Sequence, residues 1–527
     1  MTTEADVAGQ IAELVALGRG LADSGKANAA AQVFQGLHAL DPAHPEVNKQ
    51  LGIILATRGD FAGAAPFLER AVAAAPQDVL AHNALSACRF EAGAFEAALA
   101  SADTALALLP DFAPALNNRG NALLRLGRPA EALEAQELAA ALTPEDAIVW
   151  LNLANAQRDV GQPHAALASL EKTLALDPGL HQAHTNAGNV LQDLGRREEA
   201  LDRYAAALAL DPGSVDAHWN RSLLNLLMGN FEAGWREYEW RWRRDARESR
   251  PRGLAAPLWQ GEPLTGQTLL LHCEQGLGDS VQFIRFATQA AARGARVIVE
   301  AFPTLIELFR SADGVAEVTP RSAAPPVTDF QCPLMSLPLA LGAFDPPRTD
   351  VPYLAPSAER RAAWRERLGP ASRPRVGLVA SGSPSHRADH LRSLPLAHLL
   401  AAAPQGLELH LLQKEVSAAE RDAAMARDVS IWAERLTDFA DTAALCELMD
   451  LVVSVDTGVA HLAGALARPV NILIAFDPDW RWGVSGEASA WYPTARVLRQ
   501  AARGDWSAPL AALAQDLAAL AGPRRSR

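Results

Sequence analysis

The sequence predicts an α-helical solenoid followed by an α/β region with two halves, each built on a parallel sheet. Residues spaced 34 apart recur through the first 246 residues, and strand-like apolar runs alternate with alanine-rich helical stretches after residue 266. The chain has 527 residues, more than one hydrophobic core normally serves, so we expect separate domains.

Proline, glycine and alanine carry the 34-residue period. The recurring residues are Pro42, Pro76, Pro110, Pro144, Pro178 and Pro212; Gly25, Gly59, Gly93, Gly127, Gly161, Gly195 and Gly229; and Ala30, Ala64, Ala98, Ala132, Ala166 and Ala200. Each unit predicts two helices, with the glycine in the turn between them, the alanine where the helices cross closely, and the proline after the second helix. The pattern resembles the tetratricopeptide repeat family over residues 11–246, with about six to seven units. The last unit is rich in aromatic residues, and we expect it to seal the stack against the next domain.

A second set of residues repeats with the same step on the first helix of each pair. Asn118, Asn152, Asn186 and Asn220 form one column, and Asn121, Asn155 and Asn189 form another on the same helix face. Asparagine side chains both donate and accept hydrogen bonds, so this ladder predicts a groove that binds the backbone of an extended acceptor protein. Alternatively, the asparagines hydrogen-bond carbonyls of loops or neighbouring helices. The pattern resembles the ladder of O-GlcNAc transferases, which implies a protein acceptor.

The charge distribution excludes one class of partner. The net charge is −13, and residues 1–230 hold 27 acidic and 15 basic residues, so the acidity belongs to the repeats. Nucleic-acid binding depends on Lys and Arg, which argues against such a partner. No run of 18 apolar residues predicts a membrane span, and the amino terminus lacks a signal-peptide pattern, so we expect a cytoplasmic protein.

Residues 247–266 lose the repeat period and are expected to form a linker. The strand-like runs that follow are 268–272, 296–300, 375–380, 408–413, 451–455 and 470–475. A proline-rich stretch at 346–373 separates residues 267–355 from residues 374–520, as two Rossmann-like halves facing a cleft require. Ligands of such sheets bind beyond the carboxyl ends of the strands, so the loops there are the candidate sites.

Two of these loops carry candidate residues. In the first, Gly276 and Gly278 allow close backbone approach, while Asp279 is either functional or a helix cap. In the second, a strand ends at Asp456 and a helix begins at Thr457. The amino terminus of that helix suits a diphosphate.

The two loops, at this separation, resemble the GT-B glycosyltransferases of the heptosyltransferase family over residues 267–505. The resemblance implies that Asp279 is catalytic, that 267–355 is the acceptor side, and that 374–520 is the nucleotide-sugar side. The residues that it implies for binding the nucleotide-sugar are Gly276, Gly278, Asp456, Thr457, Gly458 and His461. A structural alternative for His461 is a hydrogen-bonded interior histidine. The basic phosphate-binding residue of the family has no obvious counterpart; Arg392, in the loop that contains Gly382 and Ser383, and Lys414 are the candidates.

The fused architecture, with the loop 274–279, the stretch Trp480-Arg481-Trp482 and the segment Trp491-Tyr492-Pro493, also resembles bacterial repeat-containing transferases, including those that glycosylate flagellin. It implies a protein O-glycosyltransferase that moves a sugar from a nucleotide-sugar co-substrate to Ser or Thr of an acceptor protein held by the repeats. Asp477-Pro478-Asp479 has the spacing of the DxD motif of metal-using transferases, but that motif belongs to another fold, so we expect it to cap a turn and predict no metal or cofactor. Two alternatives stay open: a non-catalytic repeat scaffold, and a lipopolysaccharide-type glycan transferase.

Overall fold

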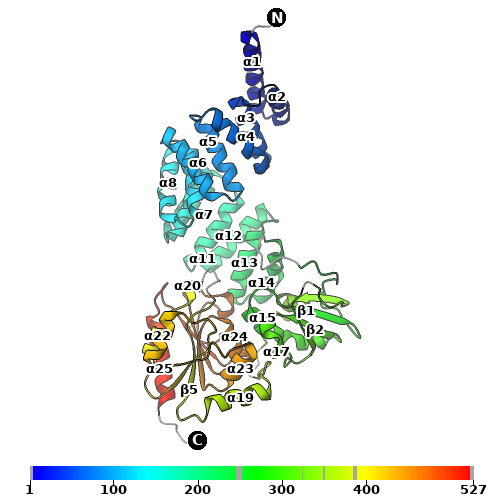
Figure 1. Ribbon diagram of the computed structural model, residues 1–527, viewed down its shortest axis with the longest axis vertical. Helices are drawn as coiled ribbons and strands as arrows, with labels where there is room; N and C mark the ends of the chain where they lie inside the picture. Colours follow the sequence, from blue (N-terminus) through cyan, green and yellow to red (C-terminus); the bar gives the residue numbers. More distant parts are fainter. Residues whose placement is uncertain (1–3, 245–251, 323, 348–350, 384–388, 523–527) are drawn as a thin grey trace. The chain divides into compact units, whose positions relative to one another are not determined.

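The computed structural model describes residues 4–244, 252–322, 324–347, 351–383 and 389–522 (Figure 1). Its contacts divide the chain into two compact units, Met1–Ser214 and Val215–Arg527, named below the repeat unit and the α/β unit. None of the described helices is both long and apolar enough to cross a lipid bilayer.

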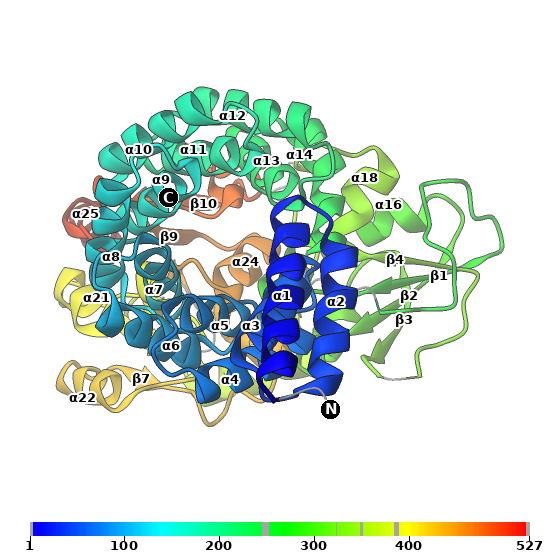
Figure 2. The same ribbon diagram turned by 90° about the horizontal axis from the view of Figure 1, so that it is seen from above.

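The described part of the repeat unit consists of twelve helices in six antiparallel pairs. They are α1 (Glu4–Asp23), α2 (Ala27–Leu40), α3 (Pro45–Thr57), α4 (Phe61–Ala74), α5 (Val79–Glu91), α6 (Phe95–Leu108), α7 (Ala113–Arg125), α8 (Pro129–Leu142), α9 (Ala147–Asp159), α10 (Pro163–Leu176), α11 (His181–Asp193) and α12 (Arg197–Leu210). Figure 2 shows α7 to α12 following one another around an arc, as stacked helix pairs do in a solenoid. The predicted solenoid is confirmed.

The recurring residues occupy the predicted places. Every recurring glycine has a backbone φ between 72° and 83°, the left-handed region that glycine adopts without a steric penalty. The six recurring alanines have no exposed surface, because the two helices of each pair cross there. Each recurring proline lies two residues after the end of a second helix.

The first helix of several pairs carries a further glycine beneath a large side chain of the second helix. A Cβ atom at Gly188 would lie 2.5 Å from Cε1 of Tyr204, and one at Gly52 would lie 2.5 Å from Cγ of Leu68. Both partner side chains are fully buried, so neither has space to move aside. These glycines therefore set how closely the paired helices approach.

The α/β unit begins with one more helical hairpin and then forms its first sheet. The hairpin comprises α13 (Val215–Met228), α14 (Phe231–Tyr238) and the 3₁₀ helix η1 (Glu239–Arg243). The first sheet and its connections are β1 (Thr268–His272), α15 (Leu277–Phe283), η3 (Ile284–Phe286), α16 (Ala287–Ala291), β2 (Arg296–Ala301), η4 (Pro303–Leu305), α17 (Ile306–Phe309), β3 (Val315–Pro320), β4 (Phe330–Pro333), η5 (Leu334–Ser336) and α18 (Leu337–Leu341). The four strands are parallel, in the order β3-β2-β1-β4.

The second sheet contains six parallel strands in the order β10-β9-β8-β5-β6-β7. Its elements are α19 (Ala358–Leu368), β5 (Arg375–Val379), α20 (Asp389–Arg392), α21 (Leu396–Ala402), β6 (Glu408–Leu411), α22 (Ala418–Ala426), β7 (Ser430–Ile431), α23 (Phe439–Glu447), β8 (Leu451–Val455), α24 (Gly458–Ala465), β9 (Val470–Ile474), η6 (Trp480–Trp482), β10 (Ala495–Arg499) and α25 (Ser507–Ala521). Counted from β5, this is the strand order of the doubly wound Rossmann fold. Two parallel sheets of this kind are consistent with the predicted GT-B arrangement.

The strands that sequence inspection misses lack a long apolar run. These are β3, β4, β7 and β10. β3 has no fully buried residue, β4 ends in a proline, and β7 has two residues. Within the predicted linker, residues 247–251 lie outside the described part. Further along it, Trp259 donates its backbone N–H to Gln331 of β4 at 2.8 Å.

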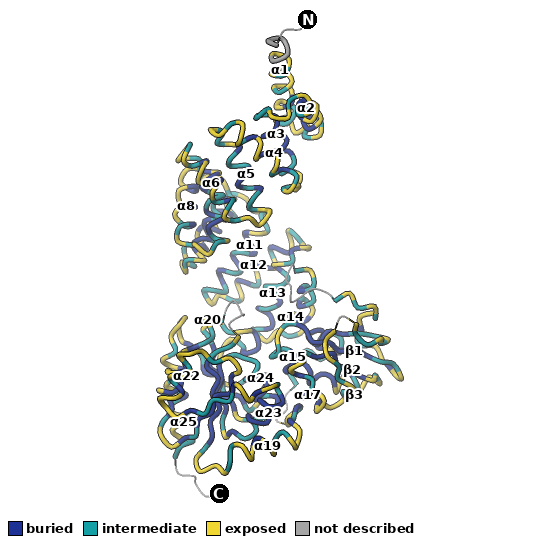
Figure 3. The backbone as a smooth tube through the Cα atoms, in the orientation of Figure 1, coloured by how far each residue is buried: buried dark blue, intermediate teal, exposed yellow. Residues whose placement is uncertain are grey.

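An aromatic cluster joins three segments of the α/β unit, whose buried interior is dark blue in Figure 3. The ring of Trp235 in α14 lies 5.4 Å from Phe283 of α15 and 5.3 Å from Trp480 of η6. Trp491 contacts both of those rings. The hairpin and both sheets therefore share one core, in which Trp235 is buried.

We expect Gly188→Ala to destabilise the repeat unit. Overpacking against Tyr204 costs about 1–3 kcal/mol, which exceeds the gain of about 1 kcal/mol in helix propensity. Gly36→Ala is the matched control, because a Cβ atom there meets nothing within 4 Å. Thermal unfolding followed by circular dichroism should show a lower Tm for Gly188→Ala and an unchanged or higher Tm for Gly36→Ala. Equal shifts for the two variants would contradict the close-crossing argument.

Candidate functional site

The second sheet brings several residues that were predicted to bind the nucleotide-sugar to the edge formed by the carboxyl ends of its strands. Its strand order reverses between β5 and β8, and doubly wound sheets bind ligands outside the carboxyl ends of the strands at such a point. Gly382 and Ser383 follow β5, and Asp456 and Thr457 follow β8. Arg392 ends α20, on the segment that leads away from β5.

The amino-terminal turns of α15 and α24 lie against each other. A Cβ atom at Gly278 would lie 2.8 Å from Cδ2 of His461 and 3.4 Å from Cα of Gly458. Only a glycine at 278 permits this approach. The loop after β1 of the first sheet and the loop after β8 of the second sheet consequently meet at one place, with Thr457 as the residue before α24.

Asp279 lies in the first turn of α15, and both of its carboxylate oxygens are engaged. Oδ2 accepts a hydrogen bond from the backbone N–H of Gly276 at 2.7 Å, which caps the helix. Oδ1 forms an ion pair with the guanidinium of Arg481 in η6. The functional and capping interpretations of Asp279 are therefore compatible.

Arg481 is buried and connects α15, the helix that follows the first loop, to η6. It pairs with Asp479 at 2.8 Å and donates to Oε1 of Gln282 at 2.5 Å, in addition to its pairing with Asp279. Burial lowers the pKa of Arg481, but Asp479 and Asp279 outweigh it and hold that pKa above its usual value. Asp479 also accepts from the backbone N–H of Arg481 at 3.0 Å, so this half of the DxD-like motif caps a turn, as expected.

His461, in α24, is 5% exposed and held on two sides. Its Nδ1 lies 2.9 Å from the hydroxyl of Tyr492, and its ring stacks on Trp482 with 5.2 Å between centroids. Its Nε2 lies 4.0 Å from Oδ1 of Asp456. Burial, followed by the positive charges of the surrounding arginines, lowers the pKa of His461 well below its usual value.

Asp456 has the opposite perturbation. Burial and the negative charge of Asp479 raise its pKa to about 6, although Trp482, Arg392 and Arg481 act in the opposite direction. Buried groups with strongly shifted pKa values mark a candidate functional site.

The segment after β5 is held together by short polar contacts. The N–H of Gly382 donates to Oγ of Ser393 at 3.1 Å. Asp389 accepts from Ser393 at 2.7 Å and from Arg392 at 3.0 Å. A Cβ atom at Gly382 would lie 2.2 Å from Oδ1 of Asp389, so a side chain there would displace the Asp389 carboxylate from its present position. Arg392 keeps 24% of its side chain exposed, and its charge acts on the pKa values of both Asp456 and His461.

Lys414, the other basic candidate, has a different environment. Its Nζ donates to the backbone carbonyls of Ala433 at 2.9 Å and Leu436 at 2.6 Å. The preceding Gln413 donates to Oγ of Ser381 at 3.0 Å, linking the end of β6 to the loop after β5. A pocket beside this loop is lined by Ser381, Gly382, Asp389, Ser417 and Glu420, among other residues.

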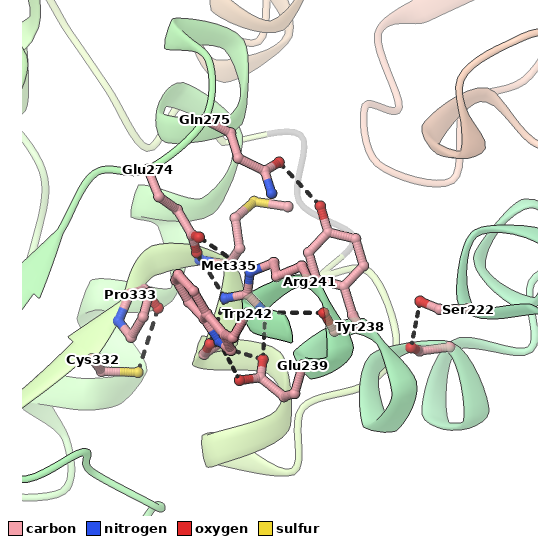
Figure 4. A network of polar contacts seen from close by, with 12 residues as sticks. Ser222, Tyr238, Glu239, Arg241, Trp242, Glu274, Gln275, Cys332, Pro333 and Met335 are labelled. Atoms are coloured by element: carbon pink, nitrogen blue, oxygen red, sulfur yellow. Dashed lines mark hydrogen bonds and ion pairs between the residues drawn. The ribbon is translucent and has the colours of Figure 1, made fainter. Parts of the chain in front are cut away.

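The loop before α15 is also held at its first residue (Figure 4). Arg241 of η1, which has no exposed surface, donates to both carboxylate oxygens of Glu274 at 3.1 and 2.8 Å. It further contacts Glu239 at 2.6 Å and Oγ of Ser336 at 2.7 Å. The next residue of the loop, Gln275, has a positive φ of 56° and accepts from the hydroxyl of Tyr238.

Sequence inspection did not assign a role to Arg241 or Arg481. Each is the central residue of a Trp-Arg-Trp segment, one in η1 and one in η6. This repeated tripeptide is the sequence signal that could have drawn attention to the two arginines. An arginine between two tryptophans is suited to a buried position, but the sequence alone does not identify the carboxylate that pairs with it.

The predicted ladder asparagines hydrogen-bond other side chains of the repeats: three of the contacts join successive repeats, and the two with Gln136 and Tyr204 lie within one helix pair. The contacts are Asn118 to Asn83 at 2.9 Å, Asn152 to Asn117 at 2.8 Å, Asn186 to Asn155 at 2.8 Å, Gln136 to Asn121 at 3.1 Å and Tyr204 to Asn189 at 2.7 Å. All seven predicted residues are half-buried, and Asn220 lies on α13 of the α/β unit. Asn83 and Asn117, one repeat apart and one position before the column of Asn118, are partners that the sequence analysis did not single out.

Comparisons with protein families match both parts of the chain. Residues 21–88 and 113–146 match the tetratricopeptide repeat, and residues 188–229 match the TPR repeat. Residues 400–478 match glycosyltransferase family 9 (heptosyltransferase), a stretch that contains Lys414 and the segment from Asp456 to His461.

Individual proteins resemble parts of the chain. Protein FlbA of Caulobacter vibrioides is 27% identical over 329 residues, 56% of this chain and 54% of FlbA, so the match spans about half the length of that relative. Among solved structures, a thermophilic tetratricopeptide protein of Thermus thermophilus is 25% identical over 35% of this chain and 100% of its own, with a TM-score of 0.32. The anaphase-promoting complex assembly Cut9-Hcn1 is 19% identical over 41% of this chain and 42% of that chain, with a TM-score of 0.38.

The family matches confirm both resemblances that the motifs predicted. The chain combines a solenoid of tetratricopeptide repeats with a glycosyltransferase family 9 domain.

Proposed function

We propose that this chain is a protein O-glycosyltransferase, which moves a sugar from a nucleotide-sugar to Ser or Thr of an acceptor protein bound by the repeats. The observation that carries the proposal is the meeting of two loops, one with Asp279 and one with the amino terminus of α24. One loop offers a base for an incoming hydroxyl, and the other offers N–H groups for a departing diphosphate.

In this proposal Asp279 accepts the proton of the acceptor hydroxyl. The hydroxyl oxygen attacks the anomeric carbon of the sugar while the bond from that carbon to the phosphate oxygen breaks, and the nucleoside diphosphate leaves. The pairing with Arg481 favours the ionised carboxylate that a base requires. Each carboxylate oxygen has two lone pairs, so both contacts of Asp279 leave capacity for the hydroxyl.

The leaving diphosphate is expected to lie against Thr457 and Gly458 at the start of α24, where the helix dipole favours negative charge. Arg392 is the better of the two basic candidates for this group, because its charge acts on Asp456 and His461. Lys414 already donates to two backbone carbonyls. Gly276, Gly278, Gly382 and Ser383, in the loops on either side of these residues, complete the proposed nucleotide-sugar site.

The direct test mixes the purified full-length chain with flagellin, the first acceptor suggested by the resemblance, and a panel of nucleotide-sugars. Intact-mass spectrometry should show a sugar added to the acceptor. Label that enters a lipid or glycan would favour the lipopolysaccharide-type transferase. If no nucleotide stabilises the chain while a partner protein still binds, the chain is a non-catalytic scaffold.

Asp279→Asn should lower transfer to the acceptor by about 10²- to 10⁴-fold, the usual contribution of a general base. Nucleoside diphosphate affinity should stay within a few-fold of wild type, since Asp479 still pairs with Arg481. Asp477→Asn serves as the control, because Asp477 is a half-exposed partner of Arg503 and such surface pairs contribute little. Transfer rates and calorimetric binding measure the two quantities; an undiminished rate in Asp279→Asn would remove it as the base.

The double variant Asn152→Ala with Asn186→Ala should raise the KM for the acceptor protein about tenfold, since each amide contributes about one hydrogen bond. Affinity for the nucleotide should not change. Glu199→Ala is the control, because Glu199 is an exposed partner of Arg196. If the double variant lowers the Tm but leaves the acceptor KM unchanged, the asparagines only join neighbouring repeats.

We also expect transfer to proceed without a divalent metal, because a basic side chain and a helix terminus supply the positive field for the diphosphate. Activity measured in excess EDTA should equal that in the presence of added Mg²⁺ or Mn²⁺. A loss in EDTA that added metal restores would show that the reaction requires a cation.

A further inference from the structure

We propose that Tyr492 is a positioning residue that holds the proton of His461 on Nε2, so that His461 meets the donor diphosphate as a neutral N–H donor. This inference rests on the proposed function, and it adds a residue that lies outside the two loops.

The geometry of the pair is tightly constrained. The Tyr492 hydroxyl lies 2.9 Å from Nδ1 of His461, and both side chains are buried. The Tyr492 ring rests on Gly464, one turn further along α24, where a Cβ atom would lie 2.3 Å from the ring. The imidazole is stacked on Trp482, which fixes the plane of the ring. Nδ1 therefore faces Tyr492, and Nε2 lies on the side of Asp456.

The hydrogen bonds around Tyr492 indicate where its proton goes. Arg285 donates to the hydroxyl of Tyr353 at 2.8 Å, and that hydroxyl donates its own proton to the carbonyl of Val281 at 3.1 Å. Arg285 and Tyr353 are the other groups within hydrogen-bonding reach of Tyr492. Arg285 can only donate, and the Tyr353 oxygen, which already accepts from Arg285, is a weaker acceptor than an imidazole nitrogen. Nδ1 of a neutral imidazole is the stronger acceptor that remains, so the Tyr492 hydroxyl donates to it.

The charges around His461 keep its ring neutral. The groups that face it are Arg481 from η6, Arg285 from η3, Arg392 from α20 and Asp456 at the end of β8. Burial and the three arginines disfavour the imidazolium, and Asp456 is 4.0 Å away, too far for a hydrogen bond to offset them. A neutral imidazole carries one proton, and if Nδ1 accepts from Tyr492 that proton is on Nε2.

The consequence is a donor fixed in place before the nucleotide arrives. An Nε2–H beside the first turn of α24 adds one hydrogen bond to those that its backbone N–H groups make with a phosphate oxygen. The opposite tautomer would present a lone pair to that oxygen, which is repulsive. Tyr492 thus acts through His461 and touches no substrate.

The first experiment measures the tautomer directly. Full-length protein labelled with ¹⁵N-histidine is examined near neutral pH without nucleotide, and the His461 signals are assigned by their loss in His461→Gln. We expect one neutral tautomer with the proton on Nε2. Tyr492→Phe should mix the tautomers or move the proton to Nδ1, whereas Tyr353→Phe, which leaves the Tyr492 contact in place, should keep the wild-type pattern. A proton on Nδ1 in the wild type overturns the proposal even if Tyr492→Phe does not fold.

The second experiment measures binding of ADP, GDP and UDP to the wild type, Tyr492→Phe and Tyr353→Phe. For the nucleotide that binds, Tyr492→Phe should weaken the Kd about three- to tenfold, the value of one hydrogen bond, and Tyr353→Phe less than twofold. An unchanged Kd in Tyr492→Phe overturns the proposed role of the N–H. Failure of all three nucleotides to bind the wild type overturns the proposed function, and with it that role, whereas the tautomer assignment depends on the spectra alone.

Discussion

The guanidinium of Arg241 lies fully buried between the last helical hairpin and the first sheet. Removing such a charge from water costs several kcal/mol, so it must be matched by well-placed acceptors. Both oxygens of Glu274, together with Glu239 and Ser336, supply them. Separating the hairpin from the sheet would break the paired contacts of Arg241 with Glu274 and leave the guanidinium with Glu239 alone among the carboxylates that it contacts. The hairpin is therefore part of the α/β fold rather than an appendage to it, which agrees with the contact division after Ser214.

A second buried arginine holds the other end of the loop in the same way. Arg481 pairs with Asp279 five residues after Glu274, so the glycine-rich loop is held at both ends by side chains from distant segments. The positive φ of Gln275 is a backbone strain that such fixed ends sustain. With its ends fixed, the loop presents Gly278 to α24 at a distance that any side chain would prevent.

Local sequence signals were sufficient to predict the solenoid, because each helix pair repeats the same turn glycine and the same alanine at the helix crossing. Local signals also identified the loops at Gly278 and Asp456 as candidate sites, because in each loop a glycine and an aspartate follow an apolar strand within a few residues. The partner of Asp279 was beyond such reasoning, because Arg481 is 202 residues away in sequence. The contact of Tyr492 with His461 depends likewise on the packing of Tyr492 over Gly464. Edge strands such as β3 were missed because their exposed residues leave no apolar run.

The surroundings of two carboxyl groups in the candidate site favour different protonation states, and this difference suits the proposed chemistry. Asp279 lies beside a buried arginine, which favours the ionised form that can accept a proton from a hydroxyl. Asp456 lies beside Asp479 in a buried environment that raises its pKa to about 6, and an arriving diphosphate would raise it further, since like charges disfavour the ionised form. The carboxyl nearer the expected diphosphate is thus the one that loses its charge most readily, which lowers the repulsion between protein and ligand. Environment, rather than residue type, separates the two roles, because both residues are aspartates, one in the first turn of α15 and the other directly after β8.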